Sequence, residues 1–379
     1  MGTTAATAER EDAKIRVMLV DDSPIIRGMN ARILDKAPRV EIVASVSNGE
    51  LAVKQMEQGG IDVVVLDIEM PVMDGLTAIP LLLKQDKNVK ILMSSTLTQH
   101  GAEVSFRALE LGAADFIPKP TNIASVDGRN AVDDYRRDII EKVSNLGTTV
   151  LKEKRRPAVA APAAPVPQPL KAKPELVYDG SRLAPKVLAF GSSTGGPQAL
   201  LQVFRNLDGD LNCPVLITQH MPPHFTEILA KHIGDVSKMP CREAIDGDVL
   251  EPGRIYVAPG DYHMIVKADG PRNILTLNQD SPENFCRPAV DPMFRSVAEC
   301  FGKRALCIVL TGMGRDGAAG AKVVADAGGC VVAQDEATSV VWGMPGATYG
   351  TGVCDAVLPI SEIAPFINKA TKGTKNGAR

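Results

Sequence analysis

Short apolar segments alternate with amphipathic ones along two long stretches of this 379-residue chain, and this alternation constrains the fold most. In residues 14 to 147, five apolar segments are each followed by a stretch with apolar residues at helical spacing. Because such repeats place strands in parallel with helices on both faces, we expect an α/β fold with a five-stranded parallel sheet. The expected strands are 15–20, 41–46, 62–67, 90–95 and 115–118.

The pattern returns in residues 183 to 370, which predicts a second α/β unit with a doubly wound, mostly parallel sheet. The expected strands here are 186–190, 214–219, 254–259, 263–267, 274–278, 305–310 and 330–334. No helical pattern separates the segments between Arg254 and Asn278, which indicates a hairpin or an antiparallel edge.

Residues 157 to 174 read PAVAAPAAPVPQPLKAKP, which is almost entirely alanine and proline. A segment without large apolar side chains cannot offset the entropy lost on ordering, and its prolines favour an extended, semi-stiff chain. We therefore assign residues 14–147 and 183–370 to two domains and residues 148–182 to an Ala/Pro-rich linker.

Charge and cysteine usage exclude several classes of protein. The net charge of −3 argues against binding to nucleic acid, and no apolar run approaches the roughly 18 residues of a membrane span. The first residues, MGTTAATAERED, lack the apolar core of a secretory signal. The seven cysteines include no C-x-x-C pair, which is typical of a reducing compartment, so we expect a cytoplasmic protein without membrane insertion.

Acidic residues collect at the predicted strand ends of the first domain, where a parallel sheet binds its ligands. The residues at these ends are Asp21, Asp22, Asp67, Ser94 or Ser95, and Lys119. Carboxylates gathered at one edge favour a hard cation such as Mg²⁺, and a lysine with a hydroxyl can bind phosphoryl oxygens. Any one aspartate would also serve as a helix cap, but the set predicts a carboxylate that can be phosphorylated.

In the second domain, a glycine-rich turn, GSSTGG at residues 191–196, follows an apolar strand and opens a helix. The turn either cradles a phosphate or presents Ser192 or Ser193 for covalent chemistry. It lacks the Gly-Lys-Ser/Thr of a P-loop, and Ser193 occupies the second glycine position of the dinucleotide pattern.

Two further strand ends carry His220 and Asp316, which a parallel sheet would bring near the serine turn. A serine requires a base to remove its proton and an acid to orient that base, so Ser193, His220 and Asp316 suit acyl transfer. Glycines let the chain turn tightly, so that backbone N–H groups, including that of Met313, point into the site.

A dinucleotide-binding interpretation stays open on local grounds. Residues 312–317, GMGRDG, match the Gly-x-Gly-x-x-Gly pattern after a strand, and Asp335 lies near the spacing of a ribose-binding acid. This alternative leaves His220 and the serine turn unexplained. A binding module without enzymatic activity is a further alternative, and His263 is a candidate to line the pocket.

The segments VDDSPIIR, VVVLDIEMPVMDGL and FIPKP resemble the signature segments of two-component response-regulator receiver domains, over residues 14 to 140. The resemblance implies a flavodoxin-like fold and phosphorylation at Asp67 by a sensor histidine kinase. It also implies Mg²⁺ bound by Asp21, Asp22, Asp67 and the carbonyl of Glu69, with Lys119 as phosphate partner, Ser94 as switch hydroxyl and Phe116 as switch aromatic.

The segments GSSTGGPQAL, ITQHMPPHFT, YVAPGDYH, RPAVDPMF and LTGMGRDG resemble the catalytic domain of the chemotaxis protein-glutamate methylesterases, the CheB family. The resemblance implies a hydrolase-type α/β domain without a cofactor. It further implies Ser193 as nucleophile, His220 as general base, Asp316 as its partner, and Met313 and Thr194 as oxyanion donors. Arg287 and Trp342 are matching positions that would contact substrate, line the pocket or simply pack.

The same resemblance implies a substrate and a form of regulation. The family hydrolyses glutamate methyl esters on the cytoplasmic domains of chemoreceptors, and many members also deamidate receptor glutamines. We expect a monomer in which the unphosphorylated first domain docks over the esterase cleft, and in which phosphorylation of Asp67 weakens that docking.

Overall fold

The computed structural model describes residues 13–120, 126–155 and 183–372. The chain divides into two compact units, residues 1–159 and 160–379. Among the described residues, no helix combines the length and the apolar character that crossing a bilayer requires.

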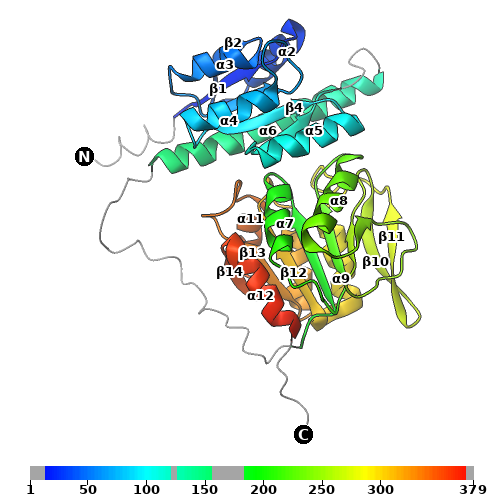
Figure 1. Cartoon of the computed structure of the whole chain (residues 1–379). Helices are drawn as coiled ribbons and strands as arrows, with labels where there is room; N and C mark the ends of the chain where they lie inside the picture. Colours follow the sequence, from blue (N-terminus) through cyan, green and yellow to red (C-terminus); the bar gives the residue numbers. More distant parts are fainter. Residues whose placement is uncertain (1–12, 121–125, 156–182, 373–379) are drawn as a thin grey trace, which may run out of the picture. The chain divides into compact units, whose positions relative to one another are not determined.

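The N-terminal unit contains a five-stranded sheet in the order β2-β1-β3-β4-β5, with every neighbouring pair parallel (Figure 1). This is the flavodoxin-like order, so the expected fold is confirmed. The strands are β1 (Ile15–Val20), β2 (Val40–Val46), β3 (Val63–Asp67), β4 (Lys90–Ser95) and β5 (Asp115–Pro118). Each differs from its expected range by at most one residue, because buried β-branched runs mark the strands clearly.

Four helices of this unit begin at a side chain that accepts a hydrogen bond from the first turn. They are α2 (Pro24–Leu34), α3 (Gly49–Met56), α4 (Gly75–Gln85) and α5 (Gln99–Glu110), capped by Ser23, Asn48, Asp74 and Thr98. These caps fix where each helix begins, and those at Ser23 and Asp74 end the loops that follow β1 and β3 at the acidic edge of the sheet.

The last helix of the unit, α6 (Val126–Arg155), continues beyond the expected domain boundary at residue 147. Its buried apolar face extends through Leu146 to Val150, and Lys154 Nζ lies 2.7 Å from Asp62 Oδ1. Residues 148–155 are therefore helical, although they were expected in the linker. The rest of the expected linker, residues 156–182, lies outside the described residues.

The C-terminal unit contains a seven-stranded sheet in the order β14-β13-β12-β6-β7-β9-β8, again entirely parallel. The strands are β6 (Val187–Ser192), β7 (Val215–Gln219), β8 (Cys241–Glu243), β9 (Ile255–Val257), β12 (Ala305–Val309), β13 (Cys330–Gln334) and β14 (Ala356–Leu358). The sequence did not predict β8 and β14, because these short edge strands are only partly buried and lack the apolar run that marks a strand such as β9.

The antiparallel element is a separate hairpin of β10 (His263–Asp269) and β11 (Arg272–Asn278), not an edge of the main sheet. Of the two arrangements considered for this region, the hairpin is therefore correct.

Helices cover both faces of the main sheet. The first group is α7 (Gly196–Arg205), α8 (Phe225–Ser237) and α12 (Ile360–Lys372); the second is α9 (Val290–Phe301), α10 (Ala318–Asp326) and α11 (Met344–Gly350) (Figure 1). A 3₁₀ turn (Gly302–Arg304) precedes β12. The strand order reverses between β6 and β12, and such a reversal opens a crevice beyond the carboxyl ends of the two strands.

Candidate functional site

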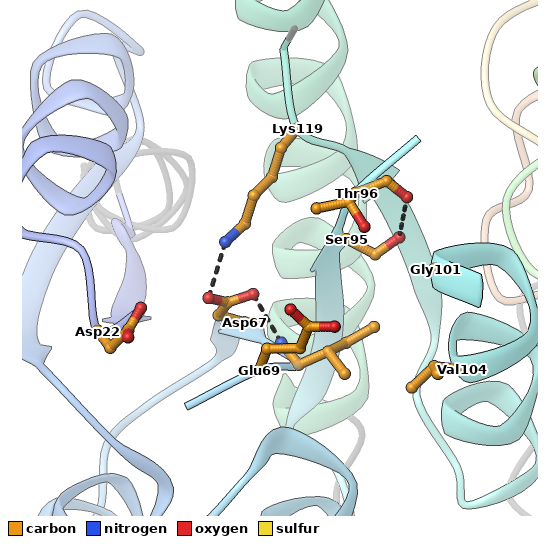
Figure 2. Close-up of a pocket in the computed structure, with 9 residues that line it drawn as sticks. Asp22, Asp67, Glu69, Ser95, Thr96, Gly101, Val104 and Lys119 are labelled. Carbon is orange, nitrogen blue, oxygen red and sulfur yellow. Dashed lines mark hydrogen bonds and ion pairs between the residues drawn. The ribbon is translucent and has the colours of Figure 1, made fainter. Parts of the chain in front are cut away.

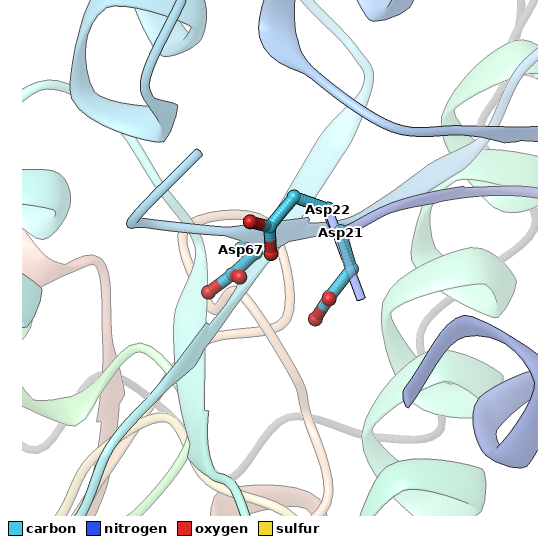
Figure 3. A group of neighbouring side chains, drawn as sticks. All are labelled: Asp21, Asp22 and Asp67. Atoms are coloured by element: carbon cyan, nitrogen blue, oxygen red, sulfur yellow. The ribbon is translucent and has the colours of Figure 1, made fainter. Parts of the chain in front are cut away.

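Three carboxylates meet at the carboxyl edge of the N-terminal sheet (Figure 3). Asp21 and Asp22 follow β1, and Asp67 ends the neighbouring strand β3; one oxygen from each lies within 4.8 Å of the others. Asp21 and Asp67 are buried and Asp22 is exposed. Such a set of hard oxygen ligands, open to solvent on one side, fits Mg²⁺, which prefers carboxylates and keeps several waters.

Lys119 provides the positive charge next to these carboxylates (Figure 2). Its Nζ lies 2.7 Å from Asp67 Oδ2 and 3.0 Å from Asp21 Oδ2, and Asp67 Oδ1 accepts a 2.8 Å hydrogen bond from the Ile68 amide. Burial raises the pKa of Asp67 to about 6, and the pairing with Lys119 opposes that shift only in part. The single positive charge of Lys119 therefore does not fully compensate the negative charge of the carboxylates, so the site favours binding of a cation.

We expect Mg²⁺ to stabilise the N-terminal unit more at pH 7.5 than at pH 5. Because its folded pKa is raised, Asp67 stabilises the metal-free fold at low pH, and this contribution is lost as pH rises through about 6. Saturating Mg²⁺ should raise the unfolding temperature by about 5 °C at pH 7.5 and by less at pH 5, as measured by calorimetry.

The matched control for this experiment is Asp67→Asn, which removes the titrating carboxylate without changing the size of the side chain. The pH-dependent part of the Mg²⁺ effect should disappear in this variant. An equal Mg²⁺ effect in wild type and variant would contradict the assignment of Asp67 to the metal site.

A cavity of about 330 Å³ opens beside Asp67 (Figure 2). Ser95 and Thr96 line it together with Glu69 and Lys119, whereas Ser94 does not. Ser95 is the last residue of β4, while Ser94 lies one residue inside the strand, opposite Asp67 in the sheet; both serines are buried. Ser95 provides a hydroxyl beside the cavity, and the switch role expected of Ser94 stays a prediction.

Phe116 lies on β5 and is buried. Lys142 Nζ of α6 lies 6.0 Å from the centre of its ring. The switch role expected of this aromatic residue stays a prediction.

The C-terminal site lies where three neighbouring strands end. Ser193 follows β6, His220 follows β7, and Asp316 lies in the turn after β12, on the other side of β6. The His220 amide donates to Ser192 O (3.1 Å), and the Ser193 amide donates to Thr311 O (3.1 Å). A Cβ on Gly312 would lie 3.0 Å from Ser193 Cβ, so a glycine is needed for the two turns to meet.

The two serines of the turn have different environments. Ser192 is fully buried, and its Oγ donates a 2.6 Å hydrogen bond to Gln219 Oε1. Gln219 Nε2 in turn donates to Ser193 O (2.9 Å). Among the described residues, the Ser193 hydroxyl has no hydrogen-bond partner, and Ser193 as a residue is 7% exposed. Ser193 is therefore the hydroxyl that is available for chemistry.

His220 and Asp316 form a hydrogen-bonded pair, with 2.7 Å between His220 Nε2 and Asp316 Oδ2. The carboxylate is 1% exposed and accepts four further hydrogen bonds. The donors are the amides of Val290 (2.6 Å), Asp291 (3.0 Å) and Gly317 (2.9 Å) and the side chain of Asn284 (3.0 Å). Burial alone would raise the pKa of Asp316, but His220 and these amides hold it below its ordinary value.

The other ring nitrogen, His220 Nδ1, lies 3.3 Å from the thiol of Cys286. Sequence reasoning missed Cys286, Asn284 and Gln219. Asn284 and Cys286 lie in a loop without periodicity, and Gln219 is the last residue of a buried strand, so no local pattern distinguishes them.

Two backbone N–H groups are candidates for binding an oxyanion. Within the described residues, the amides of Thr194 and Met313 donate no hydrogen bond. Thr194 Oγ1 is also buried without a partner there. Free donors next to Ser193 are what stabilisation of a tetrahedral intermediate requires.

Several other candidates have structural partners. His263 is buried, with Nδ1 accepting from the Ala289 amide and Nε2 near Ser281 O. Arg287 pairs with Asp261, and Trp342 donates to Gln334 O and contacts Tyr349. Asp335, the ribose-binding candidate, accepts from Thr338 within its own turn.

The N-terminal unit has a flavodoxin-like sheet with an acidic, lysine-bearing pocket, and the C-terminal unit has a serine turn beside a His–Asp pair. Together these features define a response regulator with a hydrolase effector domain. Comparisons with known proteins agree. Residues 17–129 match the model of the response regulator receiver domain, and residues 188–367 match that of the CheB methylesterases. The chain belongs to the CheB methylesterase family.

Two full-length relatives have closely similar sequences. The "protein-glutamate methylesterase/protein-glutamine glutaminase 1" of Rhodospirillum rubrum is 48% identical, covering 96% of this chain and 97% of that protein. The protein of the same name in Paramagnetospirillum magneticum is 50% identical, covering 94% and 96%. The crystal structure of the Thermotoga maritima CheB catalytic domain is 39% identical (TM-score 0.48), covering 49% of this chain and 98% of that one.

Proposed function

We propose that this protein hydrolyses glutamate methyl esters on chemoreceptors, releasing methanol, and deamidates receptor glutamines, under the control of phosphorylation at Asp67. The observation that carries the proposal is the hydrogen-bonded His220–Asp316 pair, with its buried carboxylate, beside the Ser193 turn. The names of the relatives, which join methylesterase and glutaminase activities, support the choice of substrate.

The proposed hydrolytic mechanism uses three side chains, Ser193, His220 and Asp316. Because Asp316 holds Nε2, His220 takes the proton of Ser193 through Nδ1 as the hydroxyl attacks the ester carbonyl. The negative charge of Asp316 stabilises the imidazolium that forms. The amides of Thr194 and Met313 donate to the oxyanion, which is the largest expected contribution to the rate.

The second half of the reaction regenerates the enzyme. His220 returns the proton to the leaving methoxide, methanol departs, and a glutamyl ester of Ser193 remains. Water then attacks this ester while His220 accepts its proton, giving a free carboxylate and the serine hydroxyl. A glutamine side chain follows the same course with ammonia as the leaving group.

In the N-terminal unit, Asp67 accepts a phosphoryl group from a sensor histidine kinase. Bound Mg²⁺, held by Asp21, Asp22, Asp67 and the Glu69 carbonyl, would neutralise part of the charge of that group. Lys119 lies where it can bind a phosphoryl oxygen, and the Ser95 hydroxyl lines the same cavity. Phosphorylation adds about two negative charges at this edge, which favours rearrangement of the surface carrying Ser94 and Phe116.

We expect a small-molecule phosphodonor with Mg²⁺ to raise methanol release from a methylated receptor at least about tenfold in the full chain, and Asp67→Asn to abolish the increase. Exposed Glu50 on α3 provides the matched control, because Glu50→Gln removes a carboxylate outside the acidic site. Equal stimulation of wild type and Asp67→Asn would contradict regulation through Asp67. Receptor binding without methanol release would instead indicate a docking module.

A further inference from the structure

His220 has a second polar neighbour that the hydrolytic mechanism does not use. Cys286 Sγ lies 3.3 Å from His220 Nδ1, while Asp316 Oδ2 lies 2.7 Å from Nε2. Both ring nitrogens are thus occupied. Since Asp316 retains Nε2, the nitrogen that the thiol contacts is the same one that must accept the proton of Ser193.

The loop that carries Cys286 is anchored on both sides of the thiol. Before it, Asn284 Nδ2 donates to Asp316 Oδ1 (3.0 Å) and to Asp291 Oδ2 (3.1 Å). After it, Arg287 donates to Asp261 Oδ1 from Nε (2.9 Å) and Nη2 (2.6 Å). These contacts on both sides of Cys286 hold its half-buried thiol beside the imidazole of His220, so the folded loop fixes the position of the thiol.

We propose that Cys286 is a positioning residue that holds Nδ1 of His220 in the resting site and sets the pH at which His220 becomes available as general base. The proposal rests on the proposed hydrolytic function. In this arrangement the Cys286 thiol and the Ser193 hydroxyl compete for Nδ1 of His220. The strength of the Cys286–His220 contact then controls the fraction of enzyme molecules in which Nδ1 is free to accept the proton of Ser193.

The charged groups around the imidazole determine the sign of the effect. Asp316 faces Nε2 from the turn after β12, Cys286 faces Nδ1 from the loop before α9, and Asp291 on α9 lies behind Asp316. Burial lowers the pKa of His220, but the neighbouring Cys286 and Asp316 together raise it above its ordinary value.

Only the neutral imidazole can take the proton of Ser193, so activity should rise as pH increases through the raised pKa of His220. Removing the thiol removes one of the two groups that favour the imidazolium. The rise in activity should then occur at lower pH, and the imidazole should be neutral in more molecules at neutral pH.

The experiment compares the full chain carrying Cys286→Ala or Cys286→Ser with wild type, measuring kcat and KM for methanol release across pH. The midpoint of the rise in kcat should fall by about one pH unit in Cys286→Ala, giving up to about tenfold higher kcat below it. Cys286→Ser keeps a polar group without an ionisable thiol and should shift the midpoint in the same direction. Cys241→Ala, a partly buried thiol on β8, is the matched control and should leave the profile unchanged.

A titration of the His220 ring by NMR, which needs no substrate, separates this proposal from the proposed function. The pKa of His220 should be lower in Cys286→Ala than in wild type, even if the substrate has been misassigned. Unchanged pKa values and superimposable profiles would overturn the proposal. A uniform loss of kcat without a shift of midpoint would also overturn it, because it would indicate a purely structural role for Cys286.

Discussion

Replacing Ser193 by alanine is expected to lower methanol release by at least about 10⁴-fold without unfolding the protein. The acyl-enzyme cannot form without the hydroxyl, while the turn itself is held by backbone groups: the Ser193 amide donates to Thr311 O, and its carbonyl accepts from Gln219 Nε2. The measurement is the initial rate of methanol release from methylated receptor, with Mg²⁺ and a phosphodonor present.

Ser192→Ala is the matched control, because it removes the neighbouring hydroxyl of the same turn. It leaves Gln219 Oε1 without its buried partner, which costs about 1–3 kcal/mol of the free energy of unfolding. Stability should therefore fall more in Ser192→Ala than in Ser193→Ala, while the rate falls far less. A stable but inactive Ser192→Ala protein, together with an active Ser193→Ala protein, would exchange the roles of the two serines.

The main sheets were predictable because their strands are buried on both faces and read as continuous apolar runs. Strands β1, β4, β5 and β13 begin and end where the sequence indicates. Elements defined by their neighbours were not predictable. Strand β14 has three residues and exists because it pairs with β13, and the boundary of α6 depends on the burial of Val150.

In the candidate site, too, some features were predictable from the sequence and others depend on contacts between distant residues. That His220 and Asp316 lie together follows from two strand ends on either side of β6, a consequence of topology that the sequence pattern carries. Which serine is free depends on a hydrogen bond between Ser192 and Gln219, two residues far apart in sequence. That Ser95 lines the cavity depends on the residue at which β4 ends.

Asp316→Asn is expected to lower methanol release by about 10⁴-fold. An asparagine amide that donates to Nε2 of His220 leaves the proton on Nδ1, so the ring can no longer accept the proton of Ser193. The carboxylate also accepts from three backbone amides, and the asparagine would present a donor to at least one of them. We therefore expect a loss of stability at pH 7, where the ionised carboxylate stabilises the fold.

The pH dependence distinguishes this effect from general unfolding. Because the pKa of Asp316 is lowered in the folded protein, its contribution to stability is present above the ordinary pKa of an aspartate and disappears as pH falls through the lowered value. The difference in stability between wild type and Asp316→Asn should therefore be largest near neutral pH and shrink in acid, as measured by denaturant unfolding.

Asp291→Asn is the matched control for the loss of rate. Asp291 is a buried carboxylate on α9 that accepts from the Gly320 amide (2.6 Å) and from Asn284, but it does not contact His220. Its replacement removes a negative charge near the site without changing the tautomer of His220, so the rate should fall by about tenfold or less. Equal losses of rate in the two variants would show that negative charge near the imidazole, and not the orientation of His220 by Asp316, is what the site requires.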